Sequence, residues 1–275
     1  IAAFQLPNSL RLKGEAWMAK AGLDPAIPVV LLHARDIGYR PNLSHHGHRC
    51  VDIENYRRAI NFLEDQGYQI VRLGDKTNPR LKGYTQAVID LPFHPEYDPF
   101  LDIYFAATCC FAMNQSSGPS ILVRAFKKPA LMVNRTVDWE YHPTPECLMF
   151  KHYKDATTGK ELSYGSILET GLGELSMDEE FAKAGIIIEE NTPNELEQGI
   201  KEFVALQHGK KCLDDSIQKL YLKIGNKHQD RISTNPDQYK NNTDIFGLGH
   251  KGAHVSEEFI NLNPTFLSTS HFNEV

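Results

Sequence analysis

Short apolar runs alternate with segments of helical periodicity along most of the chain. Residues 28–33 (P-V-V-L-L-H) form such a run, and its β-branched and leucine residues are typical of a strand buried in a parallel sheet. The same reasoning predicts strands at 68–73, 88–91, 109–113, 130–134 and 185–189, and helices at 52–66, 99–108, 119–126 and 192–207. This alternation predicts an α/β fold, a Rossmann-like parallel sheet with helices on both faces.

Helix-end signals support these boundaries. Gly67 is a natural stop after the helix that begins near Asp52. Thr192, Pro193 and Glu195 form the pattern of a capping box, in which threonine caps, proline starts the helix and glutamate closes the box. The sequence therefore predicts a well-defined helix after residue 192.

The remaining segments are less regular. Residues 138–175 are expected to hold one helix near Ser166, and the polar stretch 208–243 reads as a helix and an exposed loop. We therefore divide the chain into a lead segment, a Rossmann-like domain, and a polar loop with a closing helix packed back on that domain, with boundaries at 1–27, 28–207 and 208–275.

Charge argues against one class of partner. Among 275 residues there are 29 Lys and Arg against 35 Asp and Glu, which gives a net charge of −6. Duplex DNA is bound by positive surfaces, so we expect no nucleic acid partner. A local basic pocket for one or two phosphates remains compatible with this charge.

The five cysteines have no regular spacing, and no C-x-x-C pair occurs. This pattern favours reduced thiols in a cytoplasmic protein over a disulfide framework or a zinc ribbon. No apolar run approaches the roughly 20 residues of a membrane span, and residues 1–6 do not resemble a signal peptide. The first residue is not Met, so we expect a processed chain or a piece of a longer one.

The stretch from His33 to Tyr39 is the first candidate site, because ligands in open α/β sheets bind beyond the carboxyl ends of the strands. The Arg35 guanidinium could fork onto a phosphate pair. His33 could donate a second hydrogen bond, and Asp36 could orient Arg35 or accept from a ligand hydroxyl. The alternative is that Arg35 and Asp36 form an ordinary surface ion pair.

Two further candidates follow other predicted strands. Ser116, Ser117 and Gly118 precede a helix, where small residues and free main-chain N–H groups favour an anion site. The alternative there is a plain serine N-cap. Gly74 and Asp75 end the second strand, and Asp75 could bind a base or ribose edge or cap a turn. All three candidates belong to the same edge of one sheet.

Other motifs are less informative. The histidines in His45–His48 have no acidic or cysteine ligand nearby in sequence, so a solvated loop is favoured, with a basic loop over a phosphate as the second interpretation. Residues 247–252 match G-x-G-x-x-G, but too few residues follow for a βαβ unit, so we reject a dinucleotide site. A glycine-rich loop opening a helix at 255–261 remains plausible. No Asp-x-Asp pair is present, so no metal site is expected.

Several blocks together carry a family resemblance. They read L-L-H-A-R-D-I-G-Y (31–39), D-I-E-N-Y (52–56), V-R-L-G-D (71–75), D-I-Y-F-A-A-T-C (102–109), Q-S-S-G (115–118), K-K-P (127–129) and E-N-T-P-N-E-L (190–196). In this order they resemble a family of bacterial glycosyltransferases linked to surface-polysaccharide and flagellar-glycosylation genes. The ending at 253–267 looks like that family's closing helix.

The His-x-Arg-Asp stretch is also similar to the His-x-Arg motif of fucosyltransferases with two Rossmann-like domains, the GT-B architecture. The resemblance implies that Arg35, helped by His33, engages the diphosphate of a sugar nucleotide, and that Ser116, Ser117 and Gly118 cradle it. It also implies that this chain corresponds to the C-terminal, donor-binding half, with a separate N-terminal domain holding the acceptor.

The expected function is therefore metal-independent transfer of a sugar from a nucleotide-diphosphate sugar to a glycan or protein acceptor, with no other cofactor. Asp36, or a residue outside this chain, would deprotonate the acceptor hydroxyl. Two alternatives stay open: a non-catalytic sugar-nucleotide-binding module that needs a partner chain, and another polysaccharide-tailoring enzyme such as a pyruvyltransferase.

Overall fold

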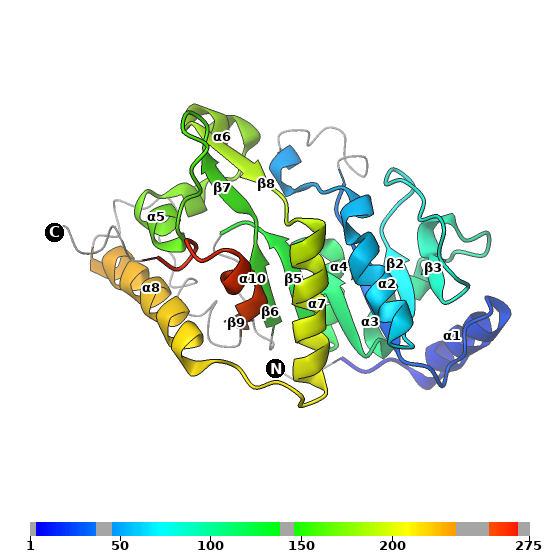
Figure 1. Cartoon of the computed structure of the whole chain (residues 1–275). Helices are drawn as coiled ribbons and strands as arrows, with labels where there is room; N and C mark the ends of the chain where they lie inside the picture. Colours follow the sequence, from blue (N-terminus) through cyan, green and yellow to red (C-terminus); the bar gives the residue numbers. More distant parts are fainter. Residues whose placement is uncertain (1–3, 37–45, 138–145, 235–252, 269–275) are drawn as a thin grey trace.

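A seven-stranded sheet forms the centre of the computed structural model, which describes residues 4–36, 46–137, 146–234 and 253–268 (Figure 1). Its strands pair in parallel throughout, so the predicted α/β, Rossmann-like fold is confirmed. In spatial order the strands are β3 (Val88–Asp90), β2 (Gln69–Leu73), β1 (Val29–His33), β4 (Phe111–Asn114), β5 (Ala130–Arg135), β6 (Glu146–Phe150) and β9 (Ala253–Val255).

The strand order reverses direction between β1 and β4. The chain moves outward from β1 through β2 to β3, returns to the other side of β1 as β4, and continues outward. In the register, Leu32 lies opposite Arg72 of β2 and opposite Met113 of β4. Such a reversal is the topological switch point at which ligands bind in open α/β sheets.

Helices cover both faces of the sheet. In Figure 1, α2, α7 and α10 lie in front of the sheet and α3 and α4 lie behind it. Helix α1 packs against α3. The helices are α1 (Asn8–Lys20), α2 (Arg57–Asp65), α3 (Phe100–Thr108), α4 (Gly118–Ala125), α5 (Tyr164–Glu169), α6 (Asp178–Lys183), α7 (Pro193–Gln207), α8 (Asp215–Thr234) and α10 (Glu257–Leu262).

The core lies where the strands are sandwiched between these helices. Every residue of β1, β2, β4, β5 and β6 is buried, as two covered faces require. Helix α7 approaches β6 so closely that a Cβ on Gly199 would lie 2.3 Å from the Met149 sulfur. A glycine at this position therefore sets the distance between helix and sheet.

With one exception, the predicted strands and helices named above begin and end within two residues of the observed ones. The exception is the helix predicted at 52–66: α2 begins only at Arg57, and a 3-10 helix at Ile53–Tyr56, capped by Asp52, precedes it.

The expected helix near Ser166 is α5, and the Thr192 capping box is present. Gly67 adopts φ +81, as a helix-ending glycine should.

The structure differs from the prediction in the segment expected to hold only that helix. It also contains β6 and β7 (His152–Asp155). The β6 strand starts with the fully buried Glu146, whose charge is paired with Arg124 of α4 at 2.7 Å. A charge in this position hides a strand from a hydrophobicity pattern, and its partner comes from a distant helix.

The predicted strand at 185–189 exists as β8 (Ile186–Glu189), but it lies outside the main sheet. It pairs antiparallel with β7 in a separate two-stranded sheet. The unpredicted β9 joins the main sheet beside β6. The C-terminal segment therefore contributes one strand to the central sheet.

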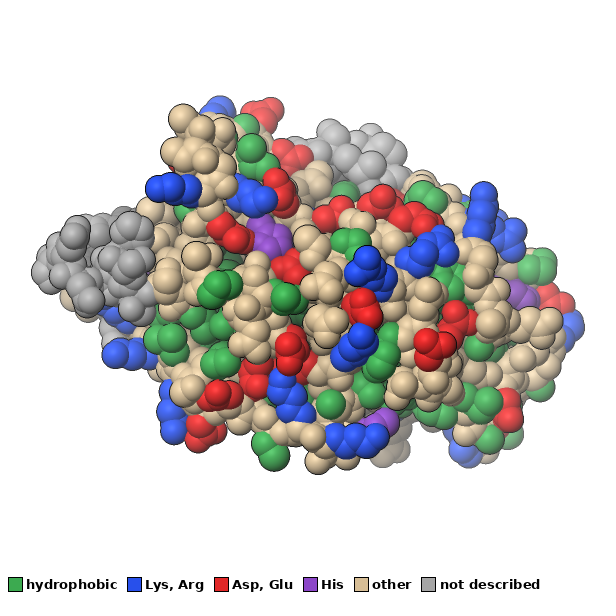
Figure 2. Space-filling view, viewed as in Figure 1, with side chains coloured by type: hydrophobic (Ala, Val, Ile, Leu, Met, Phe, Trp, Pro, Cys, Tyr) green, Lys and Arg blue, Asp and Glu red, His purple; other side chains and the backbone are tan. Residues whose placement is uncertain are grey.

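The surface over α2 and α7 has mixed charge. Figure 2 shows acidic and basic side chains interspersed on this face, with neither sign gathered into a continuous area. None of the helices described is both long and apolar enough to cross a membrane. The five cysteines are all free thiols.

Candidate functional site

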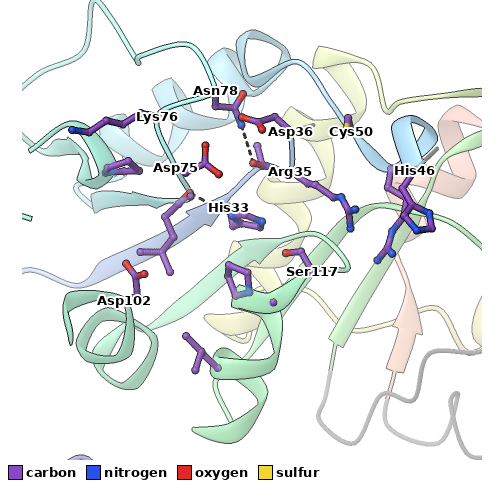
Figure 3. A pocket seen from close by; sticks show the side chains of 18 of the residues that line it. His33, Arg35, Asp36, His46, Cys50, Asp75, Lys76, Asn78, Asp102 and Ser117 are labelled. Atoms are coloured by element: carbon purple, nitrogen blue, oxygen red, sulfur yellow. Dashed lines mark hydrogen bonds between the residues drawn. The ribbon is translucent and has the colours of Figure 1, made fainter. Parts of the chain in front are cut away.

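A cavity of about 760 Å³ opens at the carboxyl edge of the sheet, beyond the ends of β1, β2 and β4 (Figure 3). Its volume lies within the roughly 300–1,000 Å³ typical of small-molecule sites. Residues following β1, β2 and β4 contribute to its walls, so it lies at the switch point of the strand order.

Most of the predicted site residues meet in this cavity. It is lined by His33, Arg35, Asp36, Gly74, Asp75, Ser117 and Gly118. Ser116 is buried beneath it and does not line it, but its carbonyl accepts a hydrogen bond from Arg49 at 2.7 Å. Tyr39 lies outside the described residues.

Arg35 connects the ends of β1 and β4. Its main-chain N–H donates to the side-chain oxygen of Gln115 at 2.5 Å. Its side chain extends into the cavity on the side where Ser117 and His46 lie, whereas the Asp36 carboxylate points the other way (Figure 3). Within the described ranges the two form no ion pair, so the surface ion pair considered from sequence is not observed.

Asp36 and its neighbours form a small polar network instead. The Thr77 hydroxyl lies 2.7 and 2.8 Å from the two carboxylate oxygens of Asp36 and also contacts Asp75. Beside Arg35, burial raises the pKa of the Cys50 thiol and the Arg35 charge opposes this shift. The Arg35 guanidinium therefore lies beside a neutral thiol and lines the cavity.

His33 ends β1 and is almost completely buried. Burial lowers the pKa of its ring to about 4, and the charges of Arg35 and Arg72 act in the same direction. Its Nδ1 lies 3.4 Å from the Leu73 carbonyl oxygen. A carbonyl only accepts, so Nδ1 carries the hydrogen of the neutral ring. This differs from the expectation that His33 donates to a phosphate, because burial prevents the second protonation.

The first turn of α4 faces the cavity through Ser117, Gly118 and Pro119. Ser117 occupies the N-cap position in an extended conformation, but its side chain makes no capping hydrogen bond. The plain serine cap considered from sequence is therefore not observed. The Ser117 hydroxyl instead lies 3.5 Å from the Gln115 carbonyl oxygen. The positive end of the helix favours an anion at this wall.

Gly74 and Asp75 shape the wall contributed by β2. Gly74 adopts φ +140, which disfavours a side chain, and a Cβ there would lie 3.9 Å from the His33 ring. Asp75 accepts the main-chain N–H of Thr77 at 2.8 Å, so the turn-capping role considered from sequence is observed. The same residue also lines the cavity.

The histidine-rich stretch is organised by a distant carboxylate. Asp178 of α6 accepts the main-chain N–H groups of Gly47 and His48, both at 2.8 Å. The His48 side chain is only 6% exposed and packs on Phe181, so the prediction of a solvated loop is wrong for this residue. Arg49 and His46 line the cavity, as the second interpretation of a basic loop over a phosphate requires.

Sequence reasoning missed one acidic residue of the cavity, Asp102. Asp102 of α3 lines the cavity and accepts a hydrogen bond from the Tyr97 hydroxyl at 3.0 Å. Burial raises the pKa of Asp102, and the Tyr97 hydrogen bond opposes this shift. The block D-I-Y-F-A-A-T-C begins at Asp102 and is the signal that could have marked it.

The cavity is thus polar at two ends. Arg35 extends toward the α4 side, and Arg49 donates to the Ser116 carbonyl just before α4. Asp36, Asp75 and Asp102 lie on the other side, together with Lys76 (Figure 3). Among the residues that the structure describes, no three His, Cys, Asp or Glu side chains gather as metal ligands.

The chain matches no protein-family model, no curated protein and no solved structure. The site must therefore be interpreted from its own geometry.

Proposed function

We propose that this chain is a glycosyltransferase, or the donor-binding domain of one, and that a nucleotide-diphosphate sugar binds in the cavity beyond the carboxyl ends of β1 and β4. One observation carries the proposal. The Arg35 guanidinium and the first turn of α4 border a single cavity at the switch point of a Rossmann-ordered sheet.

The two-ended polarity suggests how the donor lies. The diphosphate would face Arg35, Arg49 and the α4 end, where two guanidinium groups and a helix dipole supply positive charge. The hydroxyl-bearing parts would face Asp75 and Asp102, because carboxylates accept hydrogen bonds from hydroxyl groups.

The chemistry follows from the charge that grows on the leaving diphosphate. A fixed guanidinium and helix end stabilise this charge more in the transition state than in the ground state, which is usually the largest catalytic term. We assign the removal of the acceptor proton to Asp36 or to a residue of a separate acceptor-binding domain. Because the protein cations supply the charge, the proposal includes no metal, and turnover should persist in EDTA.

The first test measures binding. Thermal unfolding with ADP, GDP, CDP, UDP and dTDP, and with their sugar conjugates, should show stabilisation by the right base through mass action. Arg35→Ala should weaken that binding about a hundredfold or more, because it removes two charge-assisted hydrogen bonds. The control is Arg58→Ala, an exposed arginine on α2 that does not line the cavity.

Two outcomes contradict the proposal: no nucleotide stabilises the wild-type chain, or Arg35→Ala binds as tightly as wild type. Binding without hydrolysis or transfer of the sugar would favour the non-catalytic module.

A further inference from the structure

His33 has one ring nitrogen engaged and one unmatched. The Nδ1 atom serves the Leu73 carbonyl at 3.4 Å. The Nε2 atom is buried and has no hydrogen-bond partner among the described residues, although the ring borders the cavity. Because Nδ1 carries the hydrogen, Nε2 presents a lone pair, which can only accept a hydrogen bond.

A buried acceptor without a donor is costly, and native structures rarely leave one unexplained. In a cavity of this size the missing donor is most simply supplied by a bound molecule. The described groups of the protein therefore supply no hydrogen-bond donor to Nε2.

The surrounding charges keep the ring in this state. Burial, the largest influence, disfavours a second proton, and the charges of Arg35 and Arg72 act in the same direction. The Leu73 hydrogen bond and the Asp36 charge favour the proton but are outweighed. The cavity wall also carries the charged side chains of Arg49, Asp75, Lys76 and Asp102. The ring is therefore neutral across the range where a histidine in water would titrate.

A neutral acceptor discriminates between ligand groups. A deprotonated phosphate oxygen has no hydrogen to offer and would be repelled by the Nε2 lone pair, whereas a hydroxyl group fits it. We propose that His33 accepts a hydrogen bond at Nε2 from a hydroxyl of the ligand. The site thereby selects molecules that carry a hydroxyl close to their phosphates. This inference rests on the proposed function and reverses the role first expected of His33.

Two substitutions separate the ring nitrogens. His33→Asn retains a donor near the Nδ1 position for the Leu73 carbonyl and removes the acceptor. His33→Gln reaches the Nε2 position with an amide whose oxygen can accept. The probe is the nucleoside diphosphate of the panel that stabilises the wild-type chain most, measured by calorimetry with and without its attached hexose.

We expect His33→Asn to weaken binding about five- to tenfold and His33→Gln to restore it to within about twofold, as one hydrogen bond predicts. If His33→Asn binds both the free diphosphate and its hexose conjugate more weakly, the hydroxyl belongs to the ribose. If only the binding of the conjugate is weakened, the hydroxyl belongs to the hexose. A folding defect cannot produce this pattern, because His33→Gln also loses the Leu73 contact. Unchanged affinity in His33→Asn overturns the inference but leaves the proposed function standing.

Nitrogen NMR of histidine-labelled protein gives a second, independent measurement. At neutral pH and without ligand, His33 should show a protonated Nδ1 and a bare Nε2, and the Nε2 signal should shift when the probe is added. A charged ring, or a proton on Nε2, overturns the inference. If no nucleotide binds the wild-type chain, the proposed function fails and the hydroxyl assignment fails with it.

Discussion

Two regions of this molecule bury charged groups, and they differ in how those groups are matched. In the α7–α10 contact, formed by His152, Glu195, Glu202, Lys211, Ser256, Glu257 and Asn263, ions and hydrogen-bonding groups satisfy one another. In the cavity, Arg35 lies beside a neutral thiol, the His33 Nε2 atom has no donor in the described chain, and the Ser117 hydroxyl does not cap its helix.

This difference separates polar groups that stabilise the fold from polar groups that can bind a ligand. A matched buried ion stabilises one packing of the chain and has nothing left to offer a ligand. An unmatched polar group costs stability in the free protein and gains its partner on binding. Substitutions in the α7–α10 contact should therefore lower stability, and substitutions in the cavity should lower affinity.

The largest effect is expected from Glu202→Ala. The Glu202 carboxylate accepts the main-chain N–H groups of Glu257 and Glu258 at 3.0 and 3.1 Å, and it pairs with Lys211 at 3.2 Å. Its removal leaves two main-chain N–H groups at the start of α10 without an acceptor and takes away one of the three carboxylates around Lys211. The free energy of unfolding should therefore fall by about 3 kcal/mol. Denaturant unfolding measures this.

The matched control is Glu179→Ala. Glu179 lies on the surface of α6 and is 3.9 Å from the exposed Lys183, so its loss should cost less than about 0.5 kcal/mol. Equal losses in the two variants would show that the α7–α10 contact contributes no more than a surface pair.

The second prediction concerns pH. Burial opposes the charge on His152, but its hydrogen bonds to Glu161 and Glu195 outweigh burial and raise its pKa to about 9. The unfolded pKa is about 6.5, so this stabilisation is complete below that pH and is lost as pH rises through 9. Unfolding free energies should decline on the alkaline side by an amount on the order of 2 kcal/mol.

His33 affects the pH dependence of the unfolding free energy in the opposite direction. Its folded pKa is lowered to about 4, so its contribution is present above pH 6.5 and is lost as pH falls through 4. His152→Gln should remove the alkaline decline only, and His33→Asn the acid decline only. A wild-type stability that does not change between neutral pH and pH 10 would contradict the assignment of His152.

The third prediction concerns the cavity and the contribution of Arg49 to ligand affinity. Arg49 lines the cavity and donates to the Ser116 carbonyl at 2.7 Å. Arg49→Ala should weaken nucleoside-diphosphate binding about tenfold, a loss of about 1.4 kcal/mol, through the missing charge at the phosphates. Calorimetry measures the affinity, and Arg57→Ala on an exposed turn of α2 is the control. Unchanged affinity in Arg49→Ala would place the phosphates elsewhere.

The fold was predictable because its signals are local. A buried strand such as β1 is apolar along its whole length, and helix ends such as Thr192 and Gly67 have their own residue patterns. The edge on which Arg35 and Ser117 meet also followed from the sequence, since parallel strands all end on one side.

The rest depends on long-range contacts that no local pattern contains. Glu146 can begin the buried strand β6 only because Arg124 neutralises it. Asp178, distant in sequence, holds the turn before Arg49 and so places Arg49 at the cavity. Which nitrogen of His33 carries the hydrogen depends on the Leu73 carbonyl of β2. These contacts determine the chemistry of the site but become visible only after folding.

The smallest expected effect is the loss of stability when an N-cap residue, Thr192 or Ser117, is replaced by alanine. The Thr192 hydroxyl accepts the Glu195 N–H at 3.2 Å, so Thr192→Ala should cost about 1 kcal/mol of stability. The Ser117 side chain makes no capping hydrogen bond, so Ser117→Ala should cost less than about 0.3 kcal/mol. Denaturant midpoints with an unchanged slope report both values. Equal losses would mean that Ser117 does cap α4, and its hydroxyl would then not be reserved for a ligand.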